Sequence, residues 1–128
     1  MSDTRIAEAL LQHPSIVALV GVAALAELPQ GRSPPALVYQ AFTTPTAYLD
    51  GECISLMRMQ LNPLHKDPAG VEAIHAAIEA ALAWRAGEAL AGHHIKLIEP
   101  GPYSGWSKDE LTGTWTRARD FLVRFEPL

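Results

Sequence analysis

The sequence predicts an α+β domain with a mostly antiparallel sheet, one main helix packed across it, and short helices at the N-terminus. Strand-like segments occur in runs on both sides of a single strong helix signal, and this segregation is typical of α+β architecture. The 128 residues are 48% hydrophobic and 19% charged. This composition suits one hydrophobic core and excludes disordered and collagen-like chains. We therefore expect residues 1–128 to form a single domain.

The N-terminal segment is expected to form an amphipathic helix that ends before Pro14, because the residue before a proline avoids the α region. The apolar residues at helical spacing are Ile6, Leu10 and Leu11. Ser15 can cap one or two further helical turns over Ile16–Val20. For Val22–Leu28 the apolar pattern leaves strand and helix both open.

The apolar run Ile16–Ala26 resembles part of a secretory signal. The residues before it include Asp3, Arg5 and Glu8, so the positively charged region that a signal peptide needs is missing. The run is also too short to cross a bilayer. We expect a buried segment, synthesis in the cytoplasm and no membrane association.

Two strands are expected after the proline-rich loop Pro29–Pro35. Ala36–Thr43 and Cys53–Leu61 both alternate in the manner of strands, and Asn62-Pro63 ends the second one. Turn-forming residues fill Thr43–Gly51, which therefore reads as the connection between them. One face of the second strand is mostly apolar, as expected when a sheet covers helices on one side.

The clearest helix is predicted over Asp67–Arg85. Asp67 can accept hydrogen bonds from the first backbone N–H groups, Pro68 suits the first helical position, and Gly87 is a plausible stop. The apolar stripe consists of Val71, Ile74, Ile78, Ala81 and Leu82. This stripe predicts that the helix packs across the sheet.

Two more strands are expected after the helix. Ile95–Glu99 alternates, and Trp115–Phe125 alternates with Phe121, Val123 and Phe125 on one face. Between these strands, the polar and aromatic residues of Pro100–Gly113 indicate a long loop.

The histidines are the candidates for catalysis or metal binding. An enzyme could use His65, His75 or the pair His93 and His94. Asp67, the nearest carboxylate to His65, already serves as a helix cap. His75 and Glu72 are three residues apart on the helix, but a third ligand at metal-site spacing is missing, and this neighbourhood usually means solvated surface.

Other signatures of catalysis and phosphate binding are missing from the sequence. It contains no Gly-x-Ser-x-Gly elbow and neither glycine-rich phosphate motif. Cys53 follows Glu52, which disfavours a reactive thiolate, so a structural cysteine is expected. Arg117 and Arg119 share one strand face, with Arg124 on the other, which indicates a solvated face or salt bridges between subunits. We expect no catalytic residue, cofactor or metal.

The order of the segments resembles the bacteriophage tail-completion family. The resemblance rests on Ile6–Leu11 followed by Ile16–Gly21, the proline-preceded strand Pro35–Gln40, the strand–helix unit at Asp67–Leu82, and the closing strand Thr114–Val123. It covers essentially the whole chain. In the family an arginine- and proline-bearing segment usually follows the first helices, whereas here Val22–Leu28 is alanine-rich.

The resemblance implies a tail terminator, or head-to-tail joining protein, of a long-tailed phage or prophage. Such proteins are located in the virion, at the junction of head and tail. They cap the tail tube as a ring, typically a homohexamer, stop polymerisation of the major tail-tube protein, and meet the head-completion or connector protein. DNA passes through such a ring without specific binding, and the net charge of −4 would avoid contacts with phosphate. The family has no catalytic residues.

Two predicted loops carry large side chains that a solvated loop does not need: Tyr48 and Leu49 in one, Tyr103 and Trp106 in the other. These residues either fold back onto the core or dock against a neighbouring subunit or the tube. Together with Arg117 and Arg119 they are the predicted interface residues. Two other classes remain open, namely a small metal-dependent or hydrolytic enzyme and a dimeric adaptor domain without a role in a virion.

Overall fold

The protein is described by a computed structural model that covers residues 2–21, 23–27, 31, 33–49 and 52–127. The side chains of residues 2–3, 45–49 and 52–53 lie outside the description. The helices are α1 (Ser2–Leu11), α2 (Pro14–Val17) and α3 (Pro68–Leu82). The strands are β1 (Ala23–Leu25), β2 (Ala36–Leu49), β3 (Glu52–His65), β4 (Glu88–Leu90), β5 (His93–Asp109) and β6 (Thr114–Pro127).

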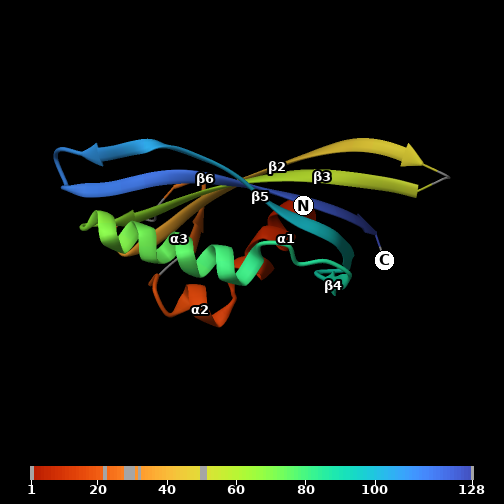
Figure 1. Cartoon of the computed structure of the whole chain (residues 1–128), viewed down its shortest axis with the longest axis horizontal. Coiled ribbons are helices and arrows are strands. Elements are labelled where there is room, and N and C mark those ends of the chain that lie inside the picture. The colour runs from red at the N-terminus through yellow and green to blue at the C-terminus, as the bar shows by residue number, and fades with distance from the viewer. Residues whose placement is uncertain (1, 22, 28–30, 32, 50–51, 128) are drawn as a thin grey trace.

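The strands form one six-stranded sheet in the order β1-β2-β3-β6-β5-β4. Every pair is antiparallel except β1 with β2. The helices lie together on one side of the long, twisted sheet (Figure 1). The predicted α+β class, with one main helix across a mostly antiparallel sheet, is confirmed.

Helix α3 begins as its sequence predicts. The Asp67 carboxylate accepts a hydrogen bond from the Ala69 N–H at 3.0 Å, and Pro68 takes the first helical position. The predicted stripe is buried. The helix ends at Leu82 and not near Arg85, because Ala83 is extended and Trp84 adopts a φ of 66°. Gly87 therefore lies in the loop beyond and is not the C-cap.

The core lies between the helices and the covered face of the sheet. Its largest buried side chains include Ile6, Leu10, Ile16, Ile78 and Phe121. The last strand presents Phe121, Val123 and Phe125 to this core, as its alternation predicts. The expectation that Ile16–Ala26 forms a buried segment is confirmed at Ile16 and Val20 and is wrong for other described residues of the run, since Val17, Leu19 and Leu25 are exposed. Among the described residues, no helix is long and apolar enough to span a membrane.

The start of the chain differs from its prediction in detail. Helix α2 begins at Pro14 and ends at Val17, and its cap is His13, whose Nδ1 accepts from the Ser15 N–H at 3.2 Å. Within Val22–Leu28, the open question is answered in favour of a strand for Ala23–Leu25, which form β1 and pair in parallel with β2. Val22 and Leu28 themselves lie outside the described residues.

The predicted turn over Thr43–Gly51 is wrong for its described part. Strand β2 runs on to Leu49 and stays paired with β3, with a register shift between Pro45 and Ala47. A bulge thus accommodates the proline within a continuous hairpin. Asp50 and Gly51 lie outside the described residues. Strand β3 likewise passes through Asn62-Pro63, the predicted end, and continues to His65.

The predicted loop Pro100–Gly113 is also wrong for most of its length. Strand β5 continues to Asp109, and the turn is confined to residues 110–113. Beyond the pairing with β4, which stops at Ile95, this part of β5 is paired on one side only, by β6. Prolines are tolerated on such an edge because the missing N–H leaves no partner unpaired.

Candidate functional site

The predicted interface residues Tyr103, Trp106, Arg117 and Arg119 come together in one cluster on strands β5 and β6. Tyr103 is opposite Arg119 and Trp106 is opposite Arg117 in the strand register. The Arg117 guanidinium lies 4.3 Å from the centre of the Tyr103 ring and 5.5 Å from that of Trp106. The Arg119 guanidinium lies 4.4 Å from the Tyr103 ring. The four side chains therefore form an alternating stack of cations and aromatic rings.

The stack lies on the side of the sheet that α3 covers. Arg117 and Arg119 alternate in phase with Phe121, so they share the face of the core residues. The predicted shared face of Arg117 and Arg119 is confirmed. We expected that face to be solvated or to form salt bridges with another subunit. For Arg119, which is only 7% exposed, the solvated reading is wrong.

All three nitrogen atoms of the Arg119 guanidinium donate hydrogen bonds within the chain. Nε donates to the Gly101 carbonyl at 3.1 Å, Nη1 to the Tyr103 hydroxyl at 3.1 Å, and Nη2 to a Glu79 carboxylate oxygen at 3.2 Å. This planar arrangement, in which Nε and both Nη atoms each donate, is one that arginine can make and lysine cannot. It fixes the outer half of β5 to both β6 and α3.

Arg117 repeats the pattern one step further along the hairpin. Its Nε donates to the Ser104 carbonyl at 3.2 Å and its Nη1 to a Glu72 carboxylate oxygen at 3.2 Å. Arg117 keeps 28% of its side chain exposed and Glu72 keeps 51%. Such an exposed ion pair contributes little stability, so Arg117 acts mainly as packing for the two rings.

His75 of α3 lies beneath this stack. It is 1% exposed, its Nε2 lies 2.5 Å from the Arg117 carbonyl oxygen, and its ring meets that of Tyr103 edge-on at 5.1 Å. The prediction of a solvated His75 is wrong. Its spacing from Val71 and Ile78 places it within the apolar stripe, and this spacing is the sequence signal that identifies the position as buried.

The aromatic side chains themselves remain accessible. Tyr103 is 38% exposed and Trp106 is 41% exposed. Trp106 meets Trp115 edge-on at 6.3 Å, and Lys108 lies 5.3 Å from the Trp115 ring. The rings thus contact their own hairpin and still present surface to a partner. For Tyr48 and Leu49 only the backbone is described, as part of β2, so their side chains lie outside the description.

The other histidines have local structural partners. His65 Nδ1 accepts a hydrogen bond from the Asp67 N–H at 3.0 Å, His93 Nδ1 lies 2.8 Å from the Ala91 carbonyl oxygen, and His94 Nδ1 lies 3.3 Å from a Glu126 carboxylate oxygen. Within the described part of the chain, no three His, Cys, Asp or Glu residues group as metal ligands.

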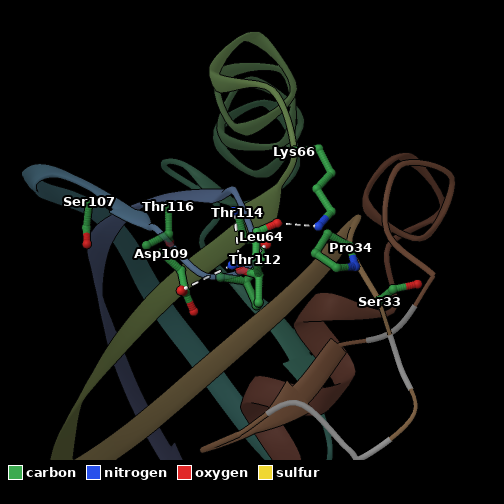
Figure 2. Close-up of a pocket in the computed structure, with 9 residues that line it drawn as sticks. All are labelled: Ser33, Pro34, Leu64, Lys66, Ser107, Asp109, Thr112, Thr114 and Thr116. Atoms are coloured by element: carbon green, nitrogen blue, oxygen red, sulfur yellow. Dashed lines mark hydrogen bonds between the residues drawn. The ribbon is translucent and has the colours of Figure 1, made fainter.

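A cavity of about 510 Å³ lies near the turn of the β5–β6 hairpin (Figure 2). Its lining is mainly hydroxyl-bearing, with one cation and one carboxylate: Ser33, Pro34, Leu64, Lys66, Ser107, Asp109, Thr112, Thr114 and Thr116. Both charges are engaged, because Lys66 donates to the Thr112 carbonyl at 2.6 Å and Asp109 accepts from the Leu111 N–H at 2.9 Å. This cavity leaves no signal in the sequence, since its walls come from separate segments of the chain.

The sequence profile of the tail completion protein gp17 family matches residues 4–124. The chain belongs to the tail completion protein gp17 family. It is therefore a structural protein of a phage-type tail, and its place is in the virion tail. The tail-completion resemblance is confirmed, and the family is one of structural proteins, not enzymes.

The fold has a counterpart among solved structures. A chain in the structure described as the virion of a native gene transfer agent (GTA) particle matches with a TM-score of 0.73 and 16% sequence identity. The match covers 97% of this chain and 93% of that chain. At this identity the likeness shows a shared fold. No curated protein matched the sequence.

Proposed function

We propose that this tail completion protein closes as a homohexameric ring on the end of the tail tube. The ring stops further addition of the major tail-tube protein and presents the surface that meets the head-completion or connector protein. The observation that carries the proposal is the family match over residues 4–124, supported by a fold shared with a chain of a phage-like particle over nearly its whole length.

The positions of the two hairpins support a ring. The β2–β3 hairpin and the β5–β6 hairpin extend to opposite ends of the long axis (Figure 1). Tyr48 and Leu49 lie in the first, and Tyr103 and Trp106 lie in the second. Contacts between unlike ends of neighbouring subunits are heterologous, and heterologous contacts generate rings when their rotation closes. Tyr103 and Trp106 offer the accessible aromatic area for such a contact or for docking to the tube.

The charge distribution supports passage of DNA without specific binding. The chain has a formal charge of −4. On the sheet face opposite the helices, Arg58 pairs with Asp120 at 2.8 Å and Lys96 pairs with Glu126 at 3.3 Å. Cations that already face carboxylates contribute less to binding phosphate, and excess negative charge repels it.

The proposal is tested by electron microscopy of polymerising tail-tube subunits with and without the purified protein. We expect tubes of limited length, each with a six-fold ring at one end. Tubes that grow to the same lengths and carry bare ends at saturating protein would contradict the proposal. A bound assembly with a symmetry other than six-fold would contradict its stoichiometry.

A further inference from the structure

The outer half of β5, which we call the strap (Pro100–Asp109), is weakly held by its backbone. Among the described strands it pairs with β6 alone, and the register shifts between Pro100 and Tyr103 and again between Tyr103 and Trp106. Every strap residue from Pro102 onward is exposed. An edge strand with an interrupted ladder and little buried area opens at low free-energy cost.

Side chains from β6 and α3 compensate for this irregular ladder. Arg119 donates to the Gly101 carbonyl and the Tyr103 hydroxyl, and Arg117 donates to the Ser104 carbonyl. The two guanidiniums are in turn held by Glu79 and Glu72 of α3. The strap therefore stays closed through polar contacts whose strength depends on the charges around them.

His75 is the buried titratable group at the centre of these contacts. A carbonyl oxygen only accepts, so the hydrogen bond to Arg117 requires a proton on His75 Nε2, and the neutral ring then carries a bare Nδ1. Among the described residues, Nδ1 has no hydrogen-bond partner. The charged and titratable groups facing the ring are Glu72 and Glu79 on α3, Arg117 and Arg119 on β6, and Tyr103 on β5.

We propose that His75 is a proton-operated latch, and that a second proton on its ring releases the strap from α3. The imidazolium would be a third cation beside two guanidiniums in a site that water barely reaches. Glu72 on the same helix favours a charged ring, but it is already paired with Arg117 at 3.2 Å, and a shift towards His75 would weaken that ion pair. Opening of the strap admits water to the His75 ring, which solvates the imidazolium and weakens its repulsion by the two guanidiniums.

The direction of the pH dependence follows from burial. Desolvation lowers the pKa of His75 below its ordinary value of 6.5, and Arg119 and Arg117 add to this effect, while the Arg117 carbonyl and Glu72 oppose it. His75 thus binds the second proton more weakly when the strap is closed than when it is open. The free energy that favours the closed strap over the open strap is therefore fully present above about pH 6.5. It is lost as the pH falls from there towards the lowered pKa of His75.

Hydrogen exchange measured by mass spectrometry on the full chain tests the latch. Between about pH 7.5 and about pH 5, after correction for intrinsic exchange, the opening constant of Tyr103–Asp109 should rise by up to about tenfold per pH unit below the ordinary pKa. The core segment at Ile74–Leu82 should stay protected. In His75→Gln, an amide donor can replace Nε2–H but cannot take up a proton, so the acid response of the strap should disappear.

The matched control is His13→Gln, which changes a partly exposed histidine at the N-cap of α2, outside α3, β5 and β6, and should keep the wild-type response. The same rise in His75→Gln as in the wild type, or no rise in the wild type, would overturn the latch. An equal rise across the whole chain would also overturn it, since that is global unfolding. If His75→Gln does not fold, NMR titration of the wild-type ring decides: protonation of His75 without a change at the Tyr103 and Trp106 amides would contradict the proposal.

Discussion

At the scale of single residues, the helix stripe was predictable and the arginine cluster was not. The spacing of Val71, Ile74 and Ile78 places them on one helix face, and all three are buried. Arg117 and Arg119 look like solvent-facing residues in any local pattern. Their environment depends on which sheet face α3 covers and on carboxylates about 40 positions away in the chain, and such distant pairing leaves no local signal.

The buried stripe predicts a large effect for Ile78→Asp. Ile78 is 0% exposed, so the substitution buries a carboxylate without a partner and should lower the free energy of unfolding by about 4 kcal/mol or more. Thermal and denaturant unfolding measure this loss. The control is Ala76→Asp at an exposed position of the same helix, where the free energy of unfolding should fall by only about 0.6 kcal/mol. Equal melting temperatures for Ile78→Asp and the wild type would show that the stripe is not core.

Trp106→Ala should separate folding from tail function. Trp106 is 41% exposed and lies on the edge strand, so the melting temperature should stay within a few degrees of the wild type while capping of tube ends is abolished. Trp84→Ala, which changes a 63% exposed tryptophan after α3, should keep both properties. Unfolding of Trp106→Ala would assign the ring to the core and contradict its docking role.

At the scale of elements, the sequence predicts the four long strands but not their lengths, and it misses the short strand β4. The strands β2, β3 and β5 all extend beyond the predicted ends, and each passes through a proline at Pro45, Pro63 or Pro100. A proline ends a strand only where its missing N–H would leave a partner unpaired. A bulge removes that cost at Pro45, and an edge position removes it at Pro100. Pro63 pairs with Leu37 of β2, and the β3–β6 register skips it, so its missing N–H leaves no partner there. None of these features is visible before the strand order is known.

The outer half of β5 allows a matched pair of glycine substitutions. A Cβ on Gly101 would lie 2.7 Å from the Asp120 carbonyl oxygen, whereas a Cβ on Gly105 would meet nothing within 4 Å. Gly101→Ala should therefore push β5 away from β6 and lower stability by about 1–3 kcal/mol, and Gly105→Ala should be near neutral. Chemical denaturation of both variants measures the difference. Equal losses would mean that the close approach at Gly101 is not what fixes β5.

At the scale of the whole molecule, composition and the order of elements predict the α+β class, and the resemblance of the segments to the tail-completion family indicates the family. The surface that would join subunits in the proposed ring is harder to predict, because an interface residue is defined by a partner that the chain alone does not contain. The exposure of the Tyr103 and Trp106 side chains makes these two residues the accessible ones among the predicted interface residues whose side chains are described. Their role in the ring remains a prediction.

The proposed ring makes a prediction about assembly. Each contact can be weak, since closure makes the last contact intramolecular, at a high effective concentration. We expect the free protein to be mainly monomeric when dilute, and hexameric on tube ends or at high concentration. Mass photometry and sedimentation velocity across a concentration series measure this. A stable dimer at every concentration, with tube present as well, would contradict it.

The long hairpins give the subunit a preferred mechanical axis. The central strands β3 and β6 are antiparallel, and the two hairpin ends lie at opposite extremes of the sheet (Figure 1). A force applied between those ends runs along the strands, so it loads the perpendicular hydrogen bonds of the β3–β6 ladder together, in shear. A force that peels β5 from β6 breaks bonds one at a time. The subunit should therefore resist stretching along its length far better than peeling at its edge.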